Sequence, residues 1–346
     1  MEQHINVSVI IPVYNSEKYI KRTIESLLNQ TIKQIEIICI NDGSTDSSLQ
    51  ILKELQKQDQ RIKIIDKKNE GIWKARMNGI EKSTGEYITF VDSDDYVEKD
   101  FIEKLYKNIQ DNKADISICG FKRMDEKSGK VLSQEMKFEQ NRVIDKNLNL
   151  EEVISVNTAL WNKLYKASII KEIKDLKNPP RILEDMMFLA LLYLNVKKIS
   201  FVDEYLYNYL VRECSAMNTL KENEIDVIQE SMIEIKQEYI NSKKEQKYIE
   251  ILSSMAFVHF GISLMLRVST DKNKNFKNEL RKNKEFLNNN FPSWKTTKYL
   301  KLFYCIKHKS NIKPAIMKKI YTSGMYGLFL KIYNFTINTL KIDIKW

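Results

Sequence analysis

The segment Gly85–Tyr96, GEYITFVDSDDY, decides the fold class of this chain. An apolar stretch typical of a buried strand, Tyr87–Val91, runs directly into three carboxylates, Asp92, Asp94 and Asp95. Open α/β sheets bind their ligands beyond the carboxyl ends of their strands. Clustered carboxylates repel one another unless a cation or a proton separates them. A hard cation such as Mg²⁺ or Mn²⁺ satisfies them and shares phosphate oxygens, so the segment predicts a metal–diphosphate site.

The N-terminal 121 residues alternate between strand-like and helix-like patterns. Near-continuous apolar runs such as VSVIIPV and IEIICI suit parallel strands buried on both faces. Repeated strand–helix–strand units predict a doubly wound α/β domain. The predicted strands are Val7–Val13, Ile35–Asn41, Arg61–Asp66, Glu86–Val91 and Asp115–Phe121. The predicted helices are Glu17–Gln30, Asp46–Gln58, Gly71–Ser83 and Lys99–Asn112.

The rest of the chain is mixed at first and then helical. A short strand at Lys130–Phe138, helices at Leu150–Val156 and Glu184–Leu194, and a strand at Glu204–Arg212 are predicted. Three helices follow, at Lys221–Ser242, Lys244–Val268 and Lys277–Asn289. We place a domain boundary near Asn218–Lys221. The prediction is a domain at 1–218, with halves 1–121 and 122–218, and a helical region at 219–346.

Composition narrows the class of protein. A hydrophobic fraction of 43% and a charged fraction of 29% are typical of a folded, soluble protein. The cysteines, Cys39, Cys119, Cys214 and Cys305, are widely spaced, which argues against a zinc site or a disulfide framework and fits a reducing cytosol. We expect no signal peptide and no transmembrane helix. His259, in FVHFGISLML, is more typical of a core histidine than of a catalyst.

The net charge of +10 belongs to the C-terminal tail, residues 291–346, which hold 11 lysines, no arginine and one acid. Lysines mixed with aromatic residues on helices suit an anionic membrane surface. A lysine face in solvent over a small helical core explains the composition equally well. Nucleic acid is disfavoured because the tail lacks arginine and any RNA-binding signature. We expect peripheral membrane contact.

Four further segments carry candidate functional residues, and each has a structural alternative. Pro12–Asn15 and Asn41–Ser44 follow predicted strands; they suit base, ribose or phosphate contacts, or simply a strand exit and a turn. Asn69–Arg76 opens a helix, where an anion or ordinary solvent would fit. In Arg181–Met187, Glu184 and Asp185 open an apolar helix. They compensate the helix dipole or, in the functional interpretation, Asp185 is a general base.

Together these segments resemble the signature of family 2 glycosyltransferases with the GT-A fold. The motifs are PVYN, NDGSTDSS, NEGIWKAR, FVDSDD and LEDMMF, and the resemblance covers roughly residues 5–215. It implies a Rossmann-like nucleotide-binding domain with a mostly parallel sheet. It also implies a UDP-sugar donor, Mn²⁺ or Mg²⁺, and inversion at the anomeric carbon. Met77 departs from the pattern, since relatives commonly have Asn there.

The resemblance also implies roles for individual residues. Asp94 matches the metal ligand of the Asp-x-Asp motif, and Asp185 matches the catalytic base. Arg212 lies where relatives often have a basic loop over the diphosphate. Trp161 and Glu184 match the acceptor side, although Trp161 is equally typical of a buried core residue. The nucleotide-sugar pocket is matched by Pro12, Tyr14, Asn15, Asp42, Arg76 and Asp92.

The function implied is transfer of a sugar to a hydroxyl of a glycan or lipid-linked acceptor in bacterial surface polysaccharide synthesis. The protein is then expected in the cytoplasm, at the inner face of the cell membrane. A sugar nucleotidyltransferase is the main alternative, but residues 1–41 contain no glycine for the Gly-rich loop of that class. A catalytically silent partner in a glycan assembly complex is another. Retention of Asp94 and Asp185 disfavours it.

Overall fold

The computed structural model describes residues 5–136, 142–212, 220, 223–271, 274–308 and 311–340, with side chains only up to residue 334 in the last range. The chain divides into two compact units. Unit 1 is Met1–Leu150, Asn157–Asp175 and Leu191–Ser215; unit 2 is Glu151–Val156, Leu176–Ala190 and Ala216–Trp346. A single division near residue 218 does not describe these units, because two earlier segments belong to unit 2. The predicted boundary itself falls mostly outside the described residues.

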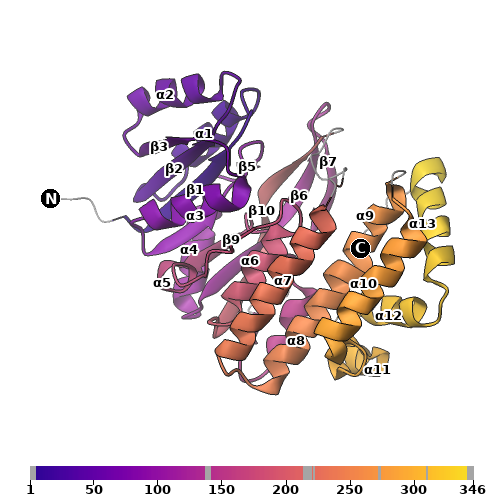
Figure 1. Ribbon diagram of the computed structural model, residues 1–346. Coiled ribbons are helices and arrows are strands. Elements are labelled where there is room, and N and C mark those ends of the chain that lie inside the picture. Colours follow the sequence, from indigo (N-terminus) through magenta and orange to yellow (C-terminus); the bar gives the residue numbers. More distant parts are fainter. Residues whose placement is uncertain are drawn as a thin grey trace. The chain divides into compact units, whose positions relative to one another are not determined.

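Unit 1 is built on one ten-stranded sheet, with the order β3-β2-β1-β4-β9-β6-β10-β5, to which β7 and β8 add at β6 and β10 (Figure 1). Neighbours β3, β2, β1 and β4 are parallel, as the sequence predicted, and so are β6 and β10. The strands are β1 (Val7–Val13), β2 (Ile35–Asp42), β3 (Ile62–Lys67), β4 (Tyr87–Phe90), β5 (Tyr96–Val97), β6 (Ile116–Asp125), β7 (Val131–Glu135), β8 (Val143–Asp145), β9 (Lys163–Lys166) and β10 (Lys198–Val211).

Besides the short strands β5 and β8, which were not predicted, β9 and β10 correct the sequence prediction. The short strand β9 inserts antiparallel between β4 and β6, and its sequence KLYK is too short and polar to predict. Its Lys163 is fully buried, but the ammonium donates to the carbonyl oxygens of Asn157 and Ala159. Strand β10 starts at Lys198, earlier than predicted, and its pairing with β6 is irregular between Val202 and Tyr205. Asp203 and Glu204 lie in that irregularity. These two polar residues interrupt the apolar pattern from which the full strand could have been predicted.

Helices cover both faces of the sheet in unit 1. Alternate residues of β1, from Val7 to Val13, join one core with α1 (Ile20–Leu28), α2 (Ser48–Gln58) and α4 (Phe101–Asp111). Helix α3 (Ile72–Lys82) lies on the opposite face, where Gly79 meets the side chains of Ile10 and Ile40. The single-turn α5 (Ala167–Ile170) follows β9. Two-sided covering explains why β1 and β2 are apolar throughout.

The close approach of α3 to the sheet predicts a cost for any side chain at position 79. A Cβ on Gly79 would lie 2.4 Å from Cγ2 of Ile10, a β-branched methyl group with little freedom to move. We expect Gly79→Ala to lower the free energy of unfolding by about 1–3 kcal/mol, as overpacking usually does. Gly327→Ala is the matched control, because that helical glycine has open space around it. Equal stability of the two variants in urea unfolding would contradict this packing.

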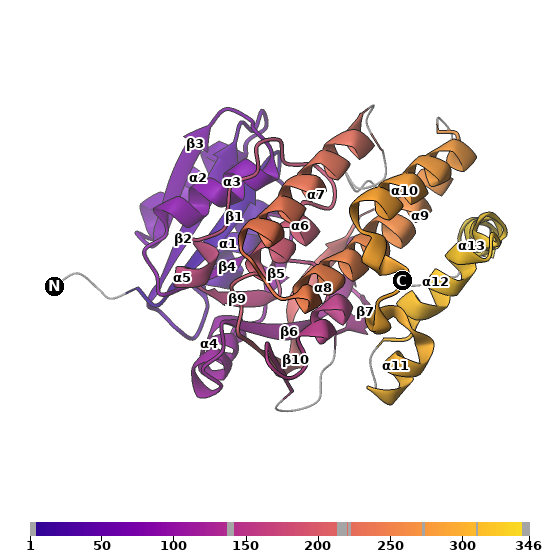
Figure 2. The same ribbon diagram turned by 60° about the horizontal axis from the view of Figure 1, so that its bottom comes forward.

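Unit 2 is helical, and α7 and α8 lie side by side in two views (Figures 1 and 2). Phe257 stacks on Trp294 with ring centroids 4.8 Å apart, and Tyr321 packs edge-on against both rings. The helices are α6 (Glu184–Leu192), α7 (Glu224–Asn241), α8 (Gln246–Ala256), α9 (Met265–Thr270), α10 (Phe276–Asn290), α11 (Leu302–Lys307), α12 (Lys313–Thr322) and α13 (Tyr326–Leu340). A π-helical segment, Phe257–Leu264, joins α8 to α9, and 3₁₀ turns lie at Leu150–Ser155, Pro292–Trp294 and Lys298–Leu300.

The continuous helical stretch Gln246–Thr270 corrects one expectation from the sequence. It is long and apolar enough to cross a membrane, although no such helix was predicted. However, 67% of its most apolar window is buried inside the structure, as in the core helix of a folded domain. Length and composition alone are therefore weak evidence for a membrane span here.

The cysteines of the described ranges lie in the interior. Cys39, Cys119 and Cys305 are buried free thiols, and Cys214 lies outside the described residues. His259 also fits its predicted core role, because burial, together with the charge of Arg267, lowers its pKa to about 4.

Candidate active site

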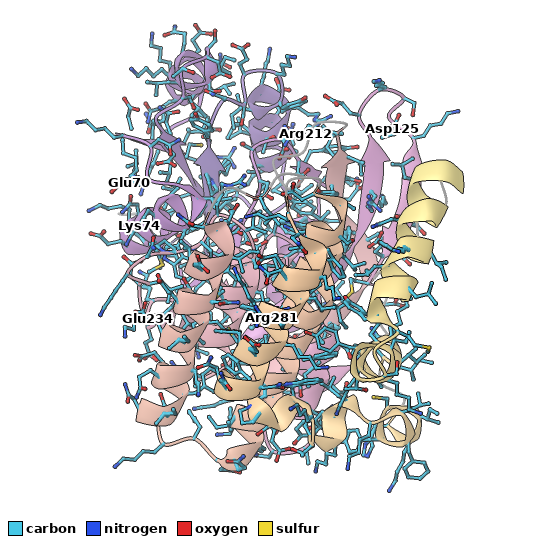
Figure 3. The ribbon with its side chains drawn as sticks, turned by 45° about the vertical axis from the view of Figure 1, so that its right-hand side comes forward. Glu70, Lys74, Asp125, Arg212, Glu234 and Arg281 are labelled. Carbon is cyan, nitrogen blue, oxygen red and sulfur yellow. The ribbon has the colours of Figure 1, made fainter. Side chains whose placement is uncertain are left out.

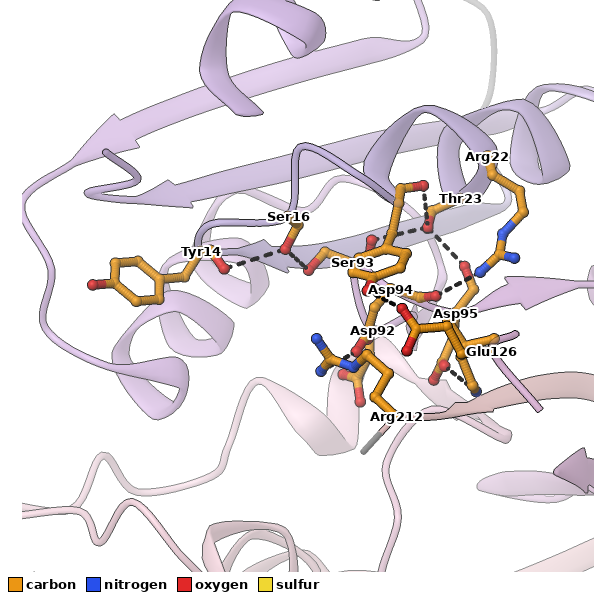
Figure 4. Close-up of polar contacts among 12 residues, drawn as sticks. Tyr14, Ser16, Arg22, Thr23, Asp92, Ser93, Asp94, Asp95, Glu126 and Arg212 are labelled. Atoms are coloured by element: carbon orange, nitrogen blue, oxygen red, sulfur yellow. Dashed lines mark hydrogen bonds and ion pairs between the residues drawn. The ribbon is translucent and has the colours of Figure 1, made fainter. Parts of the chain in front are cut away.

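The acidic turn after β4 is held in place by helix α1 (Figure 4). The Thr23 hydroxyl lies 3.0 Å from the carbonyl oxygen of Ser93 and 2.7 Å from that of Asp95. The Arg22 guanidinium donates to the carbonyl oxygen of Asp94 at 2.9 Å. These contacts fix the backbone of the turn and leave its carboxylates to other partners.

Asp95 turns inward and serves the fold. It is 1% exposed, and its carboxylate accepts hydrogen bonds from the Tyr207 hydroxyl at 2.8 Å and the Leu210 amide at 2.7 Å, both on β10. Burial raises the pKa of Asp95 well above its usual range, and the neighbouring charges of Asp94 and Asp92 raise it further. Asp95 does not cap the next helix, because α4 begins only at Phe101 and the Asp95 carboxylate bonds to β10.

Asp92 and Asp94 remain partly accessible, and each faces a guanidinium. The side chain of Asp92 is 26% exposed and lies 3.6 Å from Nη2 of Arg76. That of Asp94 is 17% exposed and forms an ion pair with Arg212. The Arg212 guanidinium also lies over the Tyr19 ring, 5.4 Å from its centroid. Two carboxylates with balancing cations thus line the edge of the sheet.

The donor set fits a divalent cation that shares its ligands with a substrate. Within the described residues, no group of three or more His, Cys, Asp or Glu side chains is arranged to hold a metal ion. Mg²⁺ sites in nucleotide enzymes commonly use one or two carboxylates and complete their shell with phosphate oxygens and water. Asp92 and Asp94 can supply that pair. The positive charge of Arg212 already lies where such an ion would neutralise Asp94.

The exits of β1 and β2 lie at the same edge of the sheet. Pro12 is buried within β1, whereas Tyr14 just beyond it is 53% exposed, so its ring is available for stacking on a base. The side-chain oxygen of Asn15 accepts from the Thr45 amide at 2.8 Å and so joins the two exits. These positions are compatible with the predicted nucleotide pocket, which stays a prediction.

Asp42 fills the anion position predicted at the start of α3. Its carboxylate accepts from the backbone amides of Glu70 at 3.0 Å and Gly71 at 2.8 Å, and from the Lys67 ammonium at 2.9 Å. An anion at this helix N-terminus was predicted as part of the ligand. In the structure it is a side chain of the protein, because Asp42 is 3% exposed and needs these donors.

The third motif is tied down in the same way. Trp73 Nε1 and Lys74 Nζ both donate to Asp175, at 2.8 and 2.5 Å. Glu70 and Lys74 lie near one another at the start of α3 (Figure 3). Arg76 is 2% exposed and points to Asp92 rather than into solvent. It can therefore influence a nucleotide-sugar only indirectly, through the Asp92 carboxylate.

Trp161, predicted on the acceptor side, is a core residue. It is 7% exposed, and its ring stacks on Tyr207 with centroids 4.2 Å apart and meets Phe121 edge-on at 4.8 Å. The structure therefore shows the buried core position that was the alternative to an acceptor-side role for Trp161. Trp161 still serves the site, because it holds the ring whose hydroxyl bonds Asp95.

Glu184 and Asp185 belong to unit 2. They are the first two residues of α6, as predicted, and the apolar residues that follow are buried. Both side chains are half-buried. The structure therefore places Asp185 at the N-terminus of α6, and its role as a base stays a prediction.

Comparison with known proteins identifies the family. The profile of "Glycosyl transferase family 2" matches residues 8–173. EpsH of Bacillus subtilis, a protein named among the glycosyltransferases, is 31% identical over 282 residues, which are 80% of this chain and 81% of EpsH. This chain belongs to glycosyltransferase family 2.

Longer relatives and a solved structure agree with this assignment. A poly(ribitol-phosphate) beta-glucosyltransferase of Bacillus spizizenii is 32% identical over 78% of this chain but only 43% of its own length. The chain spans less than half the length of several curated relatives that it matches. Staphylococcus aureus TarS 1–349, solved in complex with UDP-GlcNAc, has a TM-score of 0.69 at 24% identity and 92% coverage of both chains. The fold is therefore the GT-A fold predicted from the motifs.

Two residues of this candidate site escaped the sequence analysis. Tyr207 anchors the acidic turn by donating to Asp95 and accepting from the Asp92 amide at 3.2 Å. Tyr19 packs under Arg212 and donates to Glu126 on the turn after β6. The alternating tyrosines of YLYNY were the one available signal, since they mark a strand with one aromatic face.

The Tyr207 hydroxyl should matter more than its ring. Tyr207→Phe leaves the Asp95 carboxylate and the Asp92 amide each short of a partner, so we expect a loss of about 1–3 kcal/mol in stability and weaker metal-dependent UDP binding. Tyr209→Phe is the control, because the described residues provide no hydrogen bond to that hydroxyl. Urea unfolding and calorimetry with UDP and Mn²⁺ measure both effects. If the two variants matched, the anchoring role of Tyr207 would be wrong.

Proposed function

We propose that this protein transfers a sugar from a UDP-sugar to a hydroxyl of a glycan or lipid-linked acceptor in bacterial surface polysaccharide synthesis. The observation that carries the proposal is the acidic turn after β4. Asp95 is anchored inside, while Asp92 and Asp94 are partly exposed beside Arg76 and Arg212. Charge-balanced carboxylates at a strand end suit a metal and a diphosphate. The names of the relatives support a glycan acceptor and a UDP-linked donor.

On the donor side, the residues of unit 1 bind and orient the nucleotide. The exposed Tyr14 ring stacks on the base, and the first and second strand exits surround it. Asp94, with Asp92 beside it, holds Mn²⁺ or Mg²⁺, which when bound neutralises charge on the departing UDP. Arg212 exchanges the Asp94 carboxylate for the diphosphate, since a guanidinium binds either group in a two-pronged fashion.

On the acceptor side, Asp185 accepts the proton of the attacking hydroxyl. The oxygen then forms a bond to the anomeric carbon as the bond to the UDP oxygen breaks, and the configuration inverts. A helix N-terminus stabilises the ionised carboxylate and makes it a weaker base. That suits a reaction in which the leaving group is well advanced before the proton moves.

Release of UDP from a panel of UDP-sugars tests this function. With Mn²⁺ and a mixture of candidate acceptors, we expect one donor to be consumed, and a chelator to stop the reaction. Asp185→Asn should lower turnover by about 10²- to 10⁴-fold, the usual contribution of a general base, with UDP affinity unchanged. Asp226→Asn is the matched control, an exposed first-turn acid of α7.

Two outcomes would contradict the proposal. Full turnover in Asp185→Asn would remove the assigned base. Absence of both UDP release and calorimetric UDP binding in the wild type would remove the donor site.

We also propose that the tail, residues 291–346, contacts an anionic membrane and places the protein at the cytoplasmic face. Exposed apolar residues recur at helical spacing on its helices: Phe303 and Ile306 on α11, Ile316 on α12, and Leu328 and Ile332 on α13. Lysines accompany them on every one of these helices. A second copy of the chain would bring the same lysines to this surface and repel it. Lipid head groups of opposite charge fit both features.

Vesicle co-sedimentation of the full chain tests the membrane proposal. We expect binding to vesicles with anionic lipid at low salt, less at high salt, and little to neutral vesicles. The variant Phe303→Ser/Ile306→Ser should bind several-fold more weakly. Leu148→Ser, which changes an 84% exposed residue of unit 1, should bind as the wild type does. Failure of the wild type to pellet with anionic vesicles at low salt would refute this contact.

A further inference from the structure

The helix that presents Asp185 begins from an unusual backbone conformation. Leu183 has φ = 64°, in the left-handed region that residues other than glycine, Asn and Asp rarely adopt. Its carbonyl oxygen accepts the amide of Met187 at 3.1 Å, so Leu183 is the residue from which α6 starts. Such a conformation persists only where the surroundings impose it. The direction of the next two residues, Glu184 and Asp185, depends on what imposes it.

Helix α7 begins in the same manner. Asn223 has φ = 63°, and its carbonyl oxygen accepts the amide of Val227 at 3.2 Å. The next residue, Glu224, is 6% exposed and forms an ion pair with Arg181 at 3.1 Å. Arg181 lies two residues before Leu183. The ion pair between the buried Glu224 and the exposed Arg181 therefore ties the left-handed start of α6 to the left-handed start of α7.

A second guanidinium, from α9, takes part in this cluster. Burial lowers the pKa of Arg267, while the carboxylates of Glu184 and Glu224 act in the opposite direction. The charge of Arg267 is thus stabilised electrostatically by Glu184, the residue after Leu183, and by Glu224, the partner of Arg181. His259 of the same helical stretch adds no charge at neutral pH, since burial lowers its pKa to about 4.

We propose that Glu224, paired with Arg181, is a positioning group that holds the Leu183 turn and thereby aims Asp185 for proton transfer. The proposal rests on the role of Asp185 in the proposed function. Glu224 is a positioning residue and is given no contact with the substrate. Its ion pair holds Arg181, two residues upstream of the turn. Removing the charge of Glu224 would free the turn to adopt an ordinary backbone conformation, and Asp185 would rotate with it.

Charge removal at Glu224 is the first test. We expect Glu224→Gln and Arg181→Met each to lower kcat about ten-fold, the double variant to lose little more than either, and the Kd for UDP with Mn²⁺ to stay within two-fold. The matched control is Glu285→Gln with Arg281→Met, an ion pair of the same chemistry at 3.0 Å on α10. Unchanged kcat in Glu224→Gln, or equal losses in the control pair, would overturn the proposal.

Substitutions at Leu183 distinguish a change in the orientation of Asp185 from a general loss of stability. Asn is tolerated in the left-handed region and Val is not, although the two side chains are similar in size. We expect Leu183→Asn to keep kcat within three-fold of the wild type and Leu183→Val to lower it at least ten-fold, with both chains folded by circular dichroism. Equal kcat in the two variants would overturn the proposal.

A readout that needs no turnover distinguishes this proposal from the proposed function. The Met187 amide is bonded to Leu183, so its hydrogen exchange should accelerate at least ten-fold in Glu224→Gln and not in Glu285→Gln. Faster exchange in a protein that consumes no UDP-sugar would refute the proposed function and leave the support of the turn intact. Unchanged exchange would refute the support itself.

Discussion

Mutual repulsion among three carboxylates in four residues is the constraint around which unit 1 is organised. Asp92, Asp94 and Asp95 follow a buried strand whose end fixes their backbone. The fold separates them by giving each its own partner. Asp95 bonds to β10 through Tyr207 and Leu210, Asp92 faces Arg76, and Asp94 faces Arg212. Helix α1 holds the backbone of the turn. Each of the three carboxylates can therefore have a different side-chain or backbone partner. Removing any one partner leaves charge near charge in a region of low polarity.

Unit 2 also has to accommodate neighbouring carboxylates. It presents Glu184 and Asp185 at the start of an apolar helix whose later residues are buried. Buried side chains fix the helix but say little about the orientation of its first turn. That first turn starts from the left-handed Leu183, and Arg181 just before it pairs with Glu224 of α7. The helical region after residue 220 therefore contacts the start of α6 as well as carrying the basic tail.

Local pattern predicted much of the fold and part of the site. Strands β1 to β4 and their parallel order followed from apolar runs, and Asp92 and Asp94 from their place at a strand end. Features that depend on distant pairing were not predictable. Strand β9 is four residues long, and its buried Lys163 is satisfied by carbonyl groups that no pattern reveals. Trp161 was given an acceptor-side role, with a buried core position as the alternative, because a sequence does not show which contacts within the protein a side chain makes. The structure shows the core position. The nucleotide role of Asp42 stays a prediction.

The pairing of acids with guanidinium groups also affects how this edge of the sheet meets an anion. A cluster of bare carboxylates would surround the edge with negative potential and slow the approach of a diphosphate. Here Arg76 and Arg212 lie within contact distance of two of the acids, and burial of Asp95 favours its neutral form. The two guanidinium charges therefore offset the two partly exposed carboxylates and reduce their repulsion of an approaching anion.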